Sequence, residues 1–236
     1  MSDPSSTSRE PVLGSRVEDP RTSNAKGKLV SPLNMSLIRE RVRGRVPRDA
    51  LVDSVLSQLA PEAPQLTLRR AAVAAIVRDH RELGPEVLFI RRAEHPGDPW
   101  SGHMAFPGGR EEPSDADLLQ TAIRETREEV SLDLAANAAL LGRLDELPAV
   151  ARGLRTGLTI TPFVFELTRD APLHFNGEVS EIVWAPLAQL FGGELATVFP
   201  HEIGGQRIEL PAHDVQGRIV WGLTHRMLES LFALLR

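Results

Sequence analysis

Three glutamates, Glu125, Glu128 and Glu129, lie within five residues of one another in a segment whose apolar residues recur at helical spacing. On a helix, Glu125 and Glu129 stack one turn apart, and Glu128 lies between them in azimuth. Like charges at this spacing destabilise a helix by ~0.2–0.5 kcal/mol per pair, and the helix dipole disfavours anions near the C-terminal end. Three carboxylates on one face suit a hard divalent cation, because Mg²⁺ takes oxygen ligands and leaves its other positions to water and substrate phosphate. The helix alone is equally typical of a solvated surface helix rich in Glu and Arg.

A sharp turn at residues 107–109, with the sequence Pro-Gly-Gly, precedes this helix. Its two glycines, Gly108 and Gly109, permit positive φ or the close approach of another group to the backbone. They are candidate substrate-binding residues together with Arg91 and Arg92, whose guanidinium groups could meet substrate phosphate. Either arginine is equally typical of a strand edge that faces water.

The start of the helix has its own signal. Ser114 and Asp117 form an S-x-x-D capping-box signature, which predicts that the helix begins at about Asp115. Arg124 joins the candidate catalytic set, because a charge-assisted hydrogen bond from its guanidinium would orient the carboxylates.

The order of these residues resembles the Nudix box, whose pattern is G-x5-E-x7-R-E-U-x-E-E-x-G-U with U aliphatic. The R-E-x-x-E-E core at residues 124–129 is complete, Leu132 matches the last aliphatic position, and Gly109 stands one residue before the first glycine of the pattern. The resemblance implies a Nudix-type α/β/α sandwich with a mixed β-sheet. It also implies that the three glutamates bind the metal ion, with Glu128 as ligand or base. Four positions depart from the pattern, namely Arg110, Ala116, Thr126 and Ser131.

Residues 88–109 are similar to the signature of the coenzyme A pyrophosphatase branch of that family. Arg92, Gly102 and the F-P-G-G turn at residues 106–109 match it, whereas Gly-Asp at residues 97–98 stands where a second Arg is expected. The resemblance implies Mg²⁺- or Mn²⁺-dependent hydrolysis of coenzyme A or an acyl derivative to 3′,5′-ADP and 4′-phosphopantetheine. ADP-ribose or another nucleoside diphosphate derivative is the alternative substrate. A catalytically silent Nudix-like binding module is the alternative from another class.

Further candidates lie downstream and in the loops. In the family a loop glutamate often completes the metal site or acts as base, so Glu181 joins the catalytic set and Glu178 is its alternative. Each is equally typical of a solvated charge. His103 is interpreted as a packed residue rather than a catalytic one. The tryptophans are expected in the core, with a base-stacking role left open for the first of Trp100, Trp184 and Trp221.

The elements that must position these residues alternate between strands and helices. Short apolar runs predict strands, and apolar residues at helical spacing predict helices. Strands mixed with helices over ~170 residues imply an α/β layer architecture, with a mixed sheet and helices on its faces. The expected strands lie at residues 71–77, 87–90, 138–147, 158–167, 182–184 and 219–221, and the expected helices at residues 49–59, 115–130, 187–191 and 224–235.

The N-terminal part differs in composition from the remainder. Residues 1–34, rich in Ser, Pro, Arg, Asn and Gly, are expected to be a disordered extension, since nothing there offsets the entropy of ordering. Residues 35–65 are interpreted as a basic segment and helix that lead into the domain, and residues 66–236 as the Nudix domain. The basic run Arg39–Arg48 is interpreted as a solvated helix face or linker rather than a nucleic-acid arm, because no aromatic residue interleaves it.

Composition and charge exclude several classes of protein. The chain has no cysteine, which excludes a disulfide scaffold, a thiol nucleophile and a thiolate metal site. Residues 1–50 carry a net charge of +4 and the remainder −9, so an acidic domain argues against general nucleic-acid binding. No apolar stretch reaches the ~20 residues of a membrane span, and the first residues do not resemble a secretory leader. We therefore expect a cytoplasmic enzyme with a small-molecule nucleoside diphosphate substrate and no membrane or nucleic-acid partner; a homodimer is left open.

Overall fold

The computed structural model describes residues 33–45, 47–48, 69–97, 100–151, 154–203 and 205–236. The helix expected at residues 49–59 and most of the extension expected at residues 1–34 lie outside these ranges. The described residues from Leu33 to Arg236 belong to one unit. Within them, no helix has the length and apolar character needed to cross a membrane.

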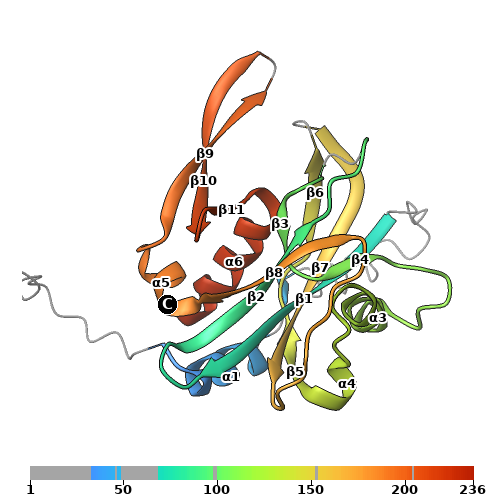
Figure 1. Ribbon diagram of the computed structural model, residues 1–236, viewed down its shortest axis with the longest axis vertical. Helices are drawn as coiled ribbons and strands as arrows, with labels where there is room; N and C mark the ends of the chain where they lie inside the picture. The colour runs from blue at the N-terminus through green and yellow to red at the C-terminus, as the bar shows by residue number, and fades with distance from the viewer. Residues whose placement is uncertain (1–32, 46, 49–68, 98–99, 152–153, 204) are drawn as a thin grey trace, which may run out of the picture. The chain divides into compact units, whose positions relative to one another are not determined.

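A mixed sheet of eight strands forms the centre of this unit (Figure 1). Its strands are β1 (Arg69–His80), β2 (Gly84–Arg92), β3 (Met104–Ala105), β4 (Gly108–Arg110), β5 (Ala138–Arg143), β6 (Leu147–Ala151), β7 (Leu154–Leu167) and β8 (Val179–Pro186). The main path runs β3-β2-β1-β7-β5, with β4 paired to β1, β6 to β7 and β8 to β2. β1 and β7 are parallel and the other described pairs are antiparallel, which confirms the mixed sheet.

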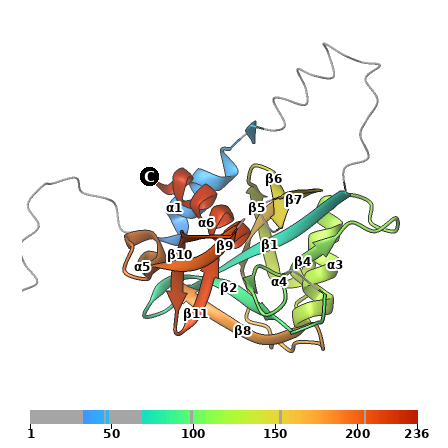
Figure 2. The same cartoon turned by 90° about the horizontal axis from the view of Figure 1, so that it is seen from above.

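Helices cover both faces of this sheet, which confirms the expected sandwich (Figure 2). The helices are α1 (Met35–Arg43), α3 (Leu118–Val130), α4 (Leu134–Asn137), α5 (Leu187–Gly192) and α6 (Gly222–Leu235). Strand side chains alternate between faces. Ile76 and Leu88 therefore lie in a core shared with α3 and α4, here called the α3 face. Their neighbours Val77 and Phe89 lie in a second core shared with α1, α5 and α6, here called the α6 face.

Helix α1 packs against the domain, whereas the sequence analysis interpreted Arg39–Arg48 as a solvated helix face or linker. Its Ile38 is fully buried on the α6 face, and the side chain of Asn34 caps the helix. The basic residues of this run also bind the domain, because Arg39 Nε donates to Glu166 of β7 at 2.7 Å. The apolar stripe of α1 is only three residues long and is interrupted by arginines, which is why charge dominated its interpretation.

Strands β1 and β2 pair only near the turn that joins them, from Val77 opposite Val87 to the turn itself. Beyond that point the two strands separate, and the segment containing β3 and β4 fills the space between them. β4 pairs with the first half of β1, and β3 pairs with the last residues of β2. The carbonyl oxygen of Pro107 accepts a hydrogen bond from the backbone N–H of Ala74 at 2.8 Å. This insertion places the Gly-Gly turn inside the sheet.

A second sheet of three antiparallel strands, in the order β11-β10-β9, lies beside α6. Its strands are β9 (Ala196–Ile203), β10 (Gln206–Val215) and β11 (Arg218–Trp221). Sequence patterns predicted β11 but neither β9 nor β10. Both contain a proline, Pro200 or Pro211, and proline within a run argues against a strand because it cannot donate to the ladder.

The remaining expected strands fall within β1, β2, β7 and β8, which are longer than their apolar runs. The strand expected at residues 138–147 divides into β5 and β6. Leu144 lies between them, where its backbone N–H donates to the carbonyl of Pro162 at 2.8 Å and its side chain is fully buried.

Candidate active site

Helix α3 carries the three glutamates and begins three residues later than the capping pattern predicted. Asp117 is its N-cap, because its side chain accepts a hydrogen bond from the backbone N–H of Gln120 at 2.8 Å. The expected cap, Ser114, precedes the helix. Asp115, which the pattern placed at the helix start, instead accepts from Arg124 Nε at 2.9 Å. That ion pair ties the loop before α3 to the helix itself.

The Gly-Gly turn packs directly against the glutamates of α3. The backbone N–H of Gly108 donates to Glu129 Oε2 at 2.8 Å. A Cβ atom on Gly108 would lie 2.3 Å from the carbonyl oxygen of Ala72, and its φ of +151° is a conformation that L side chains rarely adopt. A Cβ atom on Gly109 would lie 2.4 Å from the carboxyl carbon of Glu125. This turn needs two glycines because β1 packs against Gly108 and the carboxyl group of Glu125 packs against Gly109.

The carboxyl group of Glu129 lies in an environment that disfavours its charge. The side chain is 1% exposed, and burial is the main cause that raises its pKa to about 8. The negative charges of Glu125 and Glu178 raise the pKa of Glu129 further, whereas Arg92 opposes them. Burial also raises the pKa of Glu125, against the opposing contact with Arg124. Glu125 and Glu129 are here called the acidic group, and they lie on the α3 face. A positively charged partner would stabilise their ionised forms.

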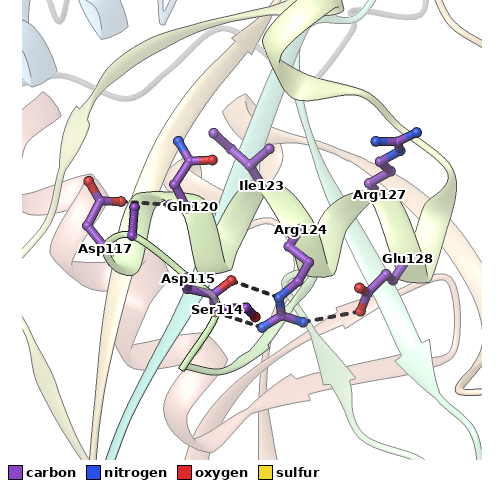
Figure 3. A pocket seen from close by; sticks show the side chains of 9 residues that line it. Ser114, Asp115, Asp117, Gln120, Ile123, Arg124, Arg127 and Glu128 are labelled. Atoms are coloured by element: carbon purple, nitrogen blue, oxygen red, sulfur yellow. Dashed lines mark hydrogen bonds and ion pairs between the residues drawn. The ribbon is translucent and has the colours of Figure 1, made fainter. Parts of the chain in front are cut away.

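Arg124 connects the loop before α3 with Glu125 and Glu128; its contacts with Asp115 and Glu128 are drawn in Figure 3. Its Nη1 donates to Glu125 Oε1 at 2.9 Å and to Glu128 Oε2 at 3.2 Å. Its Nη2 donates to the carbonyl oxygen of Arg110 at 3.0 Å and to the carboxylate of Asp115 at 3.0 Å. Because of the hydrogen bonds from Arg124, the pKa of Asp115 lies well below its ordinary value. The arginine thus has the orienting contacts that its position in the sequence suggested.

Glu128 is the most exposed of the three glutamates, with 54% of its side chain accessible. It borders a hollow of about 720 Å³ on the outer side of α3, together with Asp117, Gln120 and Arg127 (Figure 3). Glu125 and Glu129 do not line this hollow. The acidic group therefore lies between α3 and the Gly-Gly turn, and the hollow lies to one side of it.

The two arginines at the end of β2 lie on opposite faces of the sheet. Arg92 follows the alternation of Leu88 and lies on the α3 face, where its charge acts on Glu129. Arg91 lies on the α6 face and borders a cleft described below. The sequence analysis considered both arginines as candidates for binding substrate phosphate. Of the two, only Arg92 lies beside the acidic group in the structure.

The two glutamates proposed from the family pattern also separate. Glu181 is opposite Arg91 and lies two residues before Val183, which is in the core of the α6 face. Its carboxylate pairs with Arg218, and that hydrogen bond lowers its pKa. Glu178 precedes β8, and its charge raises the pKa of both Glu125 and Glu129. The structure therefore brings Glu178 rather than Glu181 to the acidic group.

An aromatic cleft of about 200 Å³ lies on the α6 face between the main sheet and the second sheet. Trp221 stacks on Phe199 with ring centroids 4.1 Å apart, and His103 meets Trp221 edge-on at 4.9 Å. Arg91 and Arg218 also line this cleft. Trp221 is half-buried rather than a core residue, which corrects the expectation. Sequence reasoning missed Phe199 and Arg218, because their contribution depends on the pairing of both β9 and β11 with β10, which was not predicted.

A divalent cation fits the residues of the acidic group. The donors are carboxylate oxygens, which Mg²⁺ and Mn²⁺ prefer. Glu129 has a buried carboxylate that accepts one hydrogen bond from the backbone and is repelled by two neighbouring carboxylates. A bound cation would remove that repulsion and favour the ionised form of Glu129. The donor set lacks sulfur and imidazole, so it suits a hard ion.

The NUDIX domain model matches residues 67–203 of the chain. A protein named Nudix hydrolase NudL from Pectobacterium atrosepticum is 32% identical over 182 residues, which cover 74% of this chain and 87% of the relative. An uncharacterized protein of Schizosaccharomyces pombe is 35% identical over 165 residues, which cover 62% of this chain. The match spans about half of the length (49%) of that yeast relative.

Solved structures with a similar chain path include two hydrolases. A Caenorhabditis elegans Ap4A hydrolase is 21% identical, with a TM-score of 0.44 over 52% of this chain and 84% of that chain. A NUDIX hydrolase from Alicyclobacillus acidocaldarius is 20% identical, with a TM-score of 0.44 over 72% of this chain and 93% of that chain.

Proposed function

The chain belongs to the Nudix hydrolase family, and from this premise we propose that it hydrolyses the diphosphate linkage of coenzyme A or an acyl-coenzyme A. The products would be 3′,5′-ADP and 4′-phosphopantetheine or its acyl derivative. Mg²⁺ or Mn²⁺ is the proposed cofactor, and the cytoplasm is the proposed location, in keeping with a chain that has no cysteine.

The observation that carries this proposal is the buried carboxylate of Glu129, held by the Gly108 amide beside Glu125. Nothing in the packing of a sheet against a helix requires like charges at this point, and a pure binding module would gain by losing them. A divalent cation held there would neutralise charge on the diphosphate and would favour ionisation of the attacking water. Glu125, Glu128 and Glu129 are the proposed ligands.

The protein's own residues have distinct proposed roles in this reaction. Arg124 orients Glu125 and Glu128 through two hydrogen bonds from one nitrogen, and so acts as a positioning residue. Glu178 is the proposed base, because its charge acts on Glu125 and Glu129 from the loop before β8. Arg92 on the same face would pair with a phosphate oxygen of the substrate.

The substrate class is supported by a combination of sequence and structure. Arg92, Gly102 and the F-P-G-G turn match the coenzyme A signature. The aromatic cleft with Trp221 and Arg91 has the composition expected for a purine ring and a further phosphate, since aromatic faces stack on bases and guanidinium groups pair with phosphates. Arg91 and Arg92 are adjacent in the chain and lie on opposite faces of the sheet, so the cleft and the acidic group lie on either side of the end of β2.

We also propose that the catalytic unit begins at Leu33 rather than at residue 66. Helix α1 supports this proposal, because Met35, Ile38 and Val42 complete the core of the α6 face.

The function is tested by incubating the full chain with Mg²⁺ or Mn²⁺ and a panel of substrates. The panel contains coenzyme A, acetyl-coenzyme A, ADP-ribose, NADH and dinucleoside polyphosphates, and mass spectrometry identifies the products. We expect cleavage of coenzyme A with a modest preference over ADP-ribose. The signature lacks its second Arg, and one charge-assisted contact contributes roughly 1.5–3 kcal/mol, or about a tenfold to hundredfold effect. Arg92→Ala should lower kcat/KM for coenzyme A by a similar factor.

Three outcomes would decide against parts of this proposal. Turnover of ADP-ribose far above that of coenzyme A would reject the substrate and keep the hydrolase. No turnover of any compound with either metal would favour the silent binding module. Equal activity of Glu125→Gln and the wild type would remove the acidic group from the chemistry.

A further inference from the structure

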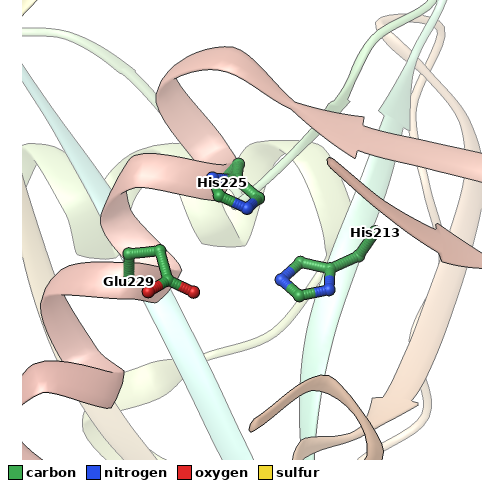
Figure 4. A group of neighbouring side chains, drawn as sticks. All are labelled: His213, His225 and Glu229. Atoms are coloured by element: carbon green, nitrogen blue, oxygen red, sulfur yellow. The ribbon is translucent and has the colours of Figure 1, made fainter. Parts of the chain in front are cut away.

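Two histidines and a glutamate meet between β10 and α6, on the side of the unit away from α3 (Figure 4). His213 belongs to β10, and His225 and Glu229 are one turn apart on α6. One ligand atom from each of the three side chains lies within 4.8 Å of the others. Figure 4 shows the two imidazole rings and the carboxylate directed toward a common space.

His213 is the unusual member of this cluster. Its side chain is 4% exposed, and neither ring nitrogen has a hydrogen-bond partner among the described residues. Buried polar atoms are almost always paired, because leaving one unpaired forfeits its hydration without replacement. The imidazole ring of His213 stacks on that of His225, with centroids 5.0 Å apart. No hydrogen bond from either nitrogen of His213 joins the two rings. A ligand that accepts a nitrogen lone pair would resolve this arrangement.

We propose that His213, His225 and Glu229 form a second metal site, specific for Zn²⁺ or a similar borderline transition-metal ion. Two imidazole nitrogens and one carboxylate oxygen are a recurrent zinc donor set, with water in the remaining position. Mg²⁺ and Ca²⁺ prefer oxygen-only sites, so the two metal sites of this protein differ in chemical selectivity.

The geometry requires only a small closure of the side chains. Nitrogen and oxygen ligands at ~2.0–2.2 Å from a tetrahedral ion lie about 3.4 Å apart, compared with the 4.8 Å spread of this cluster. Rotation of the half-buried side chains of His225 and Glu229 on the helix can supply this difference. Arg236 Nη2 contacts Glu229 Oε2 at 3.3 Å, which leaves Oε1 of the carboxylate for the ion.

The position of this site would allow a bound ion to link two elements of the fold. β10 and α6 both contribute to the core of the α6 face, through Val215 of the strand and Leu228 of the helix. An ion held by both elements would fix the second sheet to the C-terminal helix. Its ligands are separate from the acidic group, which is on the α3 face.

The experiment is a Zn²⁺ titration of the full chain after removal of metals, with excess Mg²⁺ present to compete at the acidic group. Competition with a chromophoric chelator measures stoichiometry and affinity, and Co²⁺ absorption reports nitrogen coordination. Wild type should bind one more equivalent of Zn²⁺ than His225→Ala and Glu229→Gln, and Zn²⁺ should raise its melting temperature above theirs. Loss of a direct ligand should weaken binding by more than the ~10–100-fold that follows loss of an outer-shell partner.

His174→Ala is the matched control, because His174 is an exposed histidine outside the cluster and its loss should leave Zn²⁺ binding unchanged. Mg²⁺-dependent hydrolysis should persist in His225→Ala and Glu229→Gln, which separates this inference from the proposed function. The inference is overturned if the wild type and both cluster variants bind Zn²⁺ alike, or if the wild type binds none at this site. The half-buried positions of His225 and Glu229 make both variants compatible with folding.

Discussion

The buried carboxyl group of Glu129 is unfavourable to folding when it is ionised, and it is also a proposed metal ligand. Its pKa is raised to about 8 by burial and by neighbouring carboxylates, from an ordinary value of 4.5. Between these two pH values the unfolded chain has lost this proton and the folded, metal-free protein has kept it. The unfolded state therefore binds fewer protons, and the stability of the metal-free protein falls as pH rises through that window.

Glu129→Gln should keep the shape of the side chain while removing both the charge and a proposed metal ligand. We expect Mg²⁺-dependent turnover to fall by orders of magnitude. In a chelator, the free energy of unfolding should decrease less between about pH 5 and about pH 8 in the variant than in the wild type. Urea denaturation across this range measures the difference. The exposed Glu40 of α1 provides the control, Glu40→Gln, which should follow the wild type. Parallel curves for wild type and Glu129→Gln would show that Glu129 is not the source of the pH dependence.

The two glycines of the turn make separable predictions. Gly109→Ala places a methyl group against the end of the flexible Glu125 side chain, so we expect the fold to persist and the carboxylate to move. Turnover should then fall by roughly tenfold to a hundredfold, since a misplacement of about 1 Å can have an effect of that size. Gly108→Ala instead meets backbone atoms of Ala72 and Val73 and should lower the melting temperature. Thermal unfolding and kcat at saturating Mg²⁺ distinguish the two. Wild-type turnover in Gly109→Ala would mean that the position of Glu125 is unimportant.

At the scale of elements, local signals located α3 but placed its start three residues too early. The stripe of apolar residues and the acidic residues near its start were sufficient to predict a helix ending at Val130. The choice between Ser114 and Asp117 as cap could not be made locally, because Asp115 is drawn out of the helix by Arg124. An ion pair between the loop and the helix thus accompanies a boundary that the capping pattern alone misplaced.

The register of β8 decides which glutamate reaches the acidic group. A bulge between Arg91 and Arg92 of β2 changes the pairing, so that Arg91 is opposite Glu181 and Arg92 is opposite Val179. Side-chain alternation then assigns Glu181 to the α6 face, whereas Glu178 remains in the loop before the strand. Sequence alone gives no position for a bulge, and both glutamates fitted the family pattern equally well.

This register leads to a paired prediction. Glu178→Gln should lower kcat, by ~10²–10⁴-fold if the group acts as a general base. Glu181→Gln should change KM more than kcat, because Glu181 pairs with Arg218 in the aromatic cleft. Steady-state kinetics with coenzyme A, and with ADP-ribose as comparison, measure both. A larger loss of kcat in Glu181→Gln than in Glu178→Gln would return Glu181 to the catalytic role.

For the whole molecule, the sequence predicted the sandwich because strands and helices each have a clear apolar period. It did not predict the separation of β1 from β2, which depends on contacts between β1 and residues some 35 positions later in the chain, such as Val73 with Gly108. The glycines were identified as a turn, but their position against Glu125 and Glu129 required the folded sheet. Sequence therefore identified Glu125 and Glu129 as candidates, and Arg91 and Trp221 of the aromatic cleft, but not that Phe199 and Arg218 join the latter two in one cleft.

Because α1 is part of the folded unit, a truncation in its buried stripe should lower the stability of the protein. Ile38 is fully buried in the core of the α6 face, where α1 contacts α6 and β5. Truncation of a buried isoleucine to alanine typically lowers stability by 2–5 kcal/mol, so Ile38→Ala should lower the free energy of unfolding by about 2–5 kcal/mol. Its kcat should be unchanged well below the melting temperature, because the acidic group lies on the opposite face of the sheet.

Urea denaturation and steady-state kinetics of Ile38→Ala measure the two quantities separately. Ser36→Ala, in the exposed part of the same helix, should be as stable as the wild type. If Ile38→Ala were equally stable, α1 would be an appendage and the catalytic unit would begin at β1. If Ile38→Ala lost both stability and kcat at low temperature, the two faces of the sheet would be coupled through β1, whose alternate residues belong to both cores.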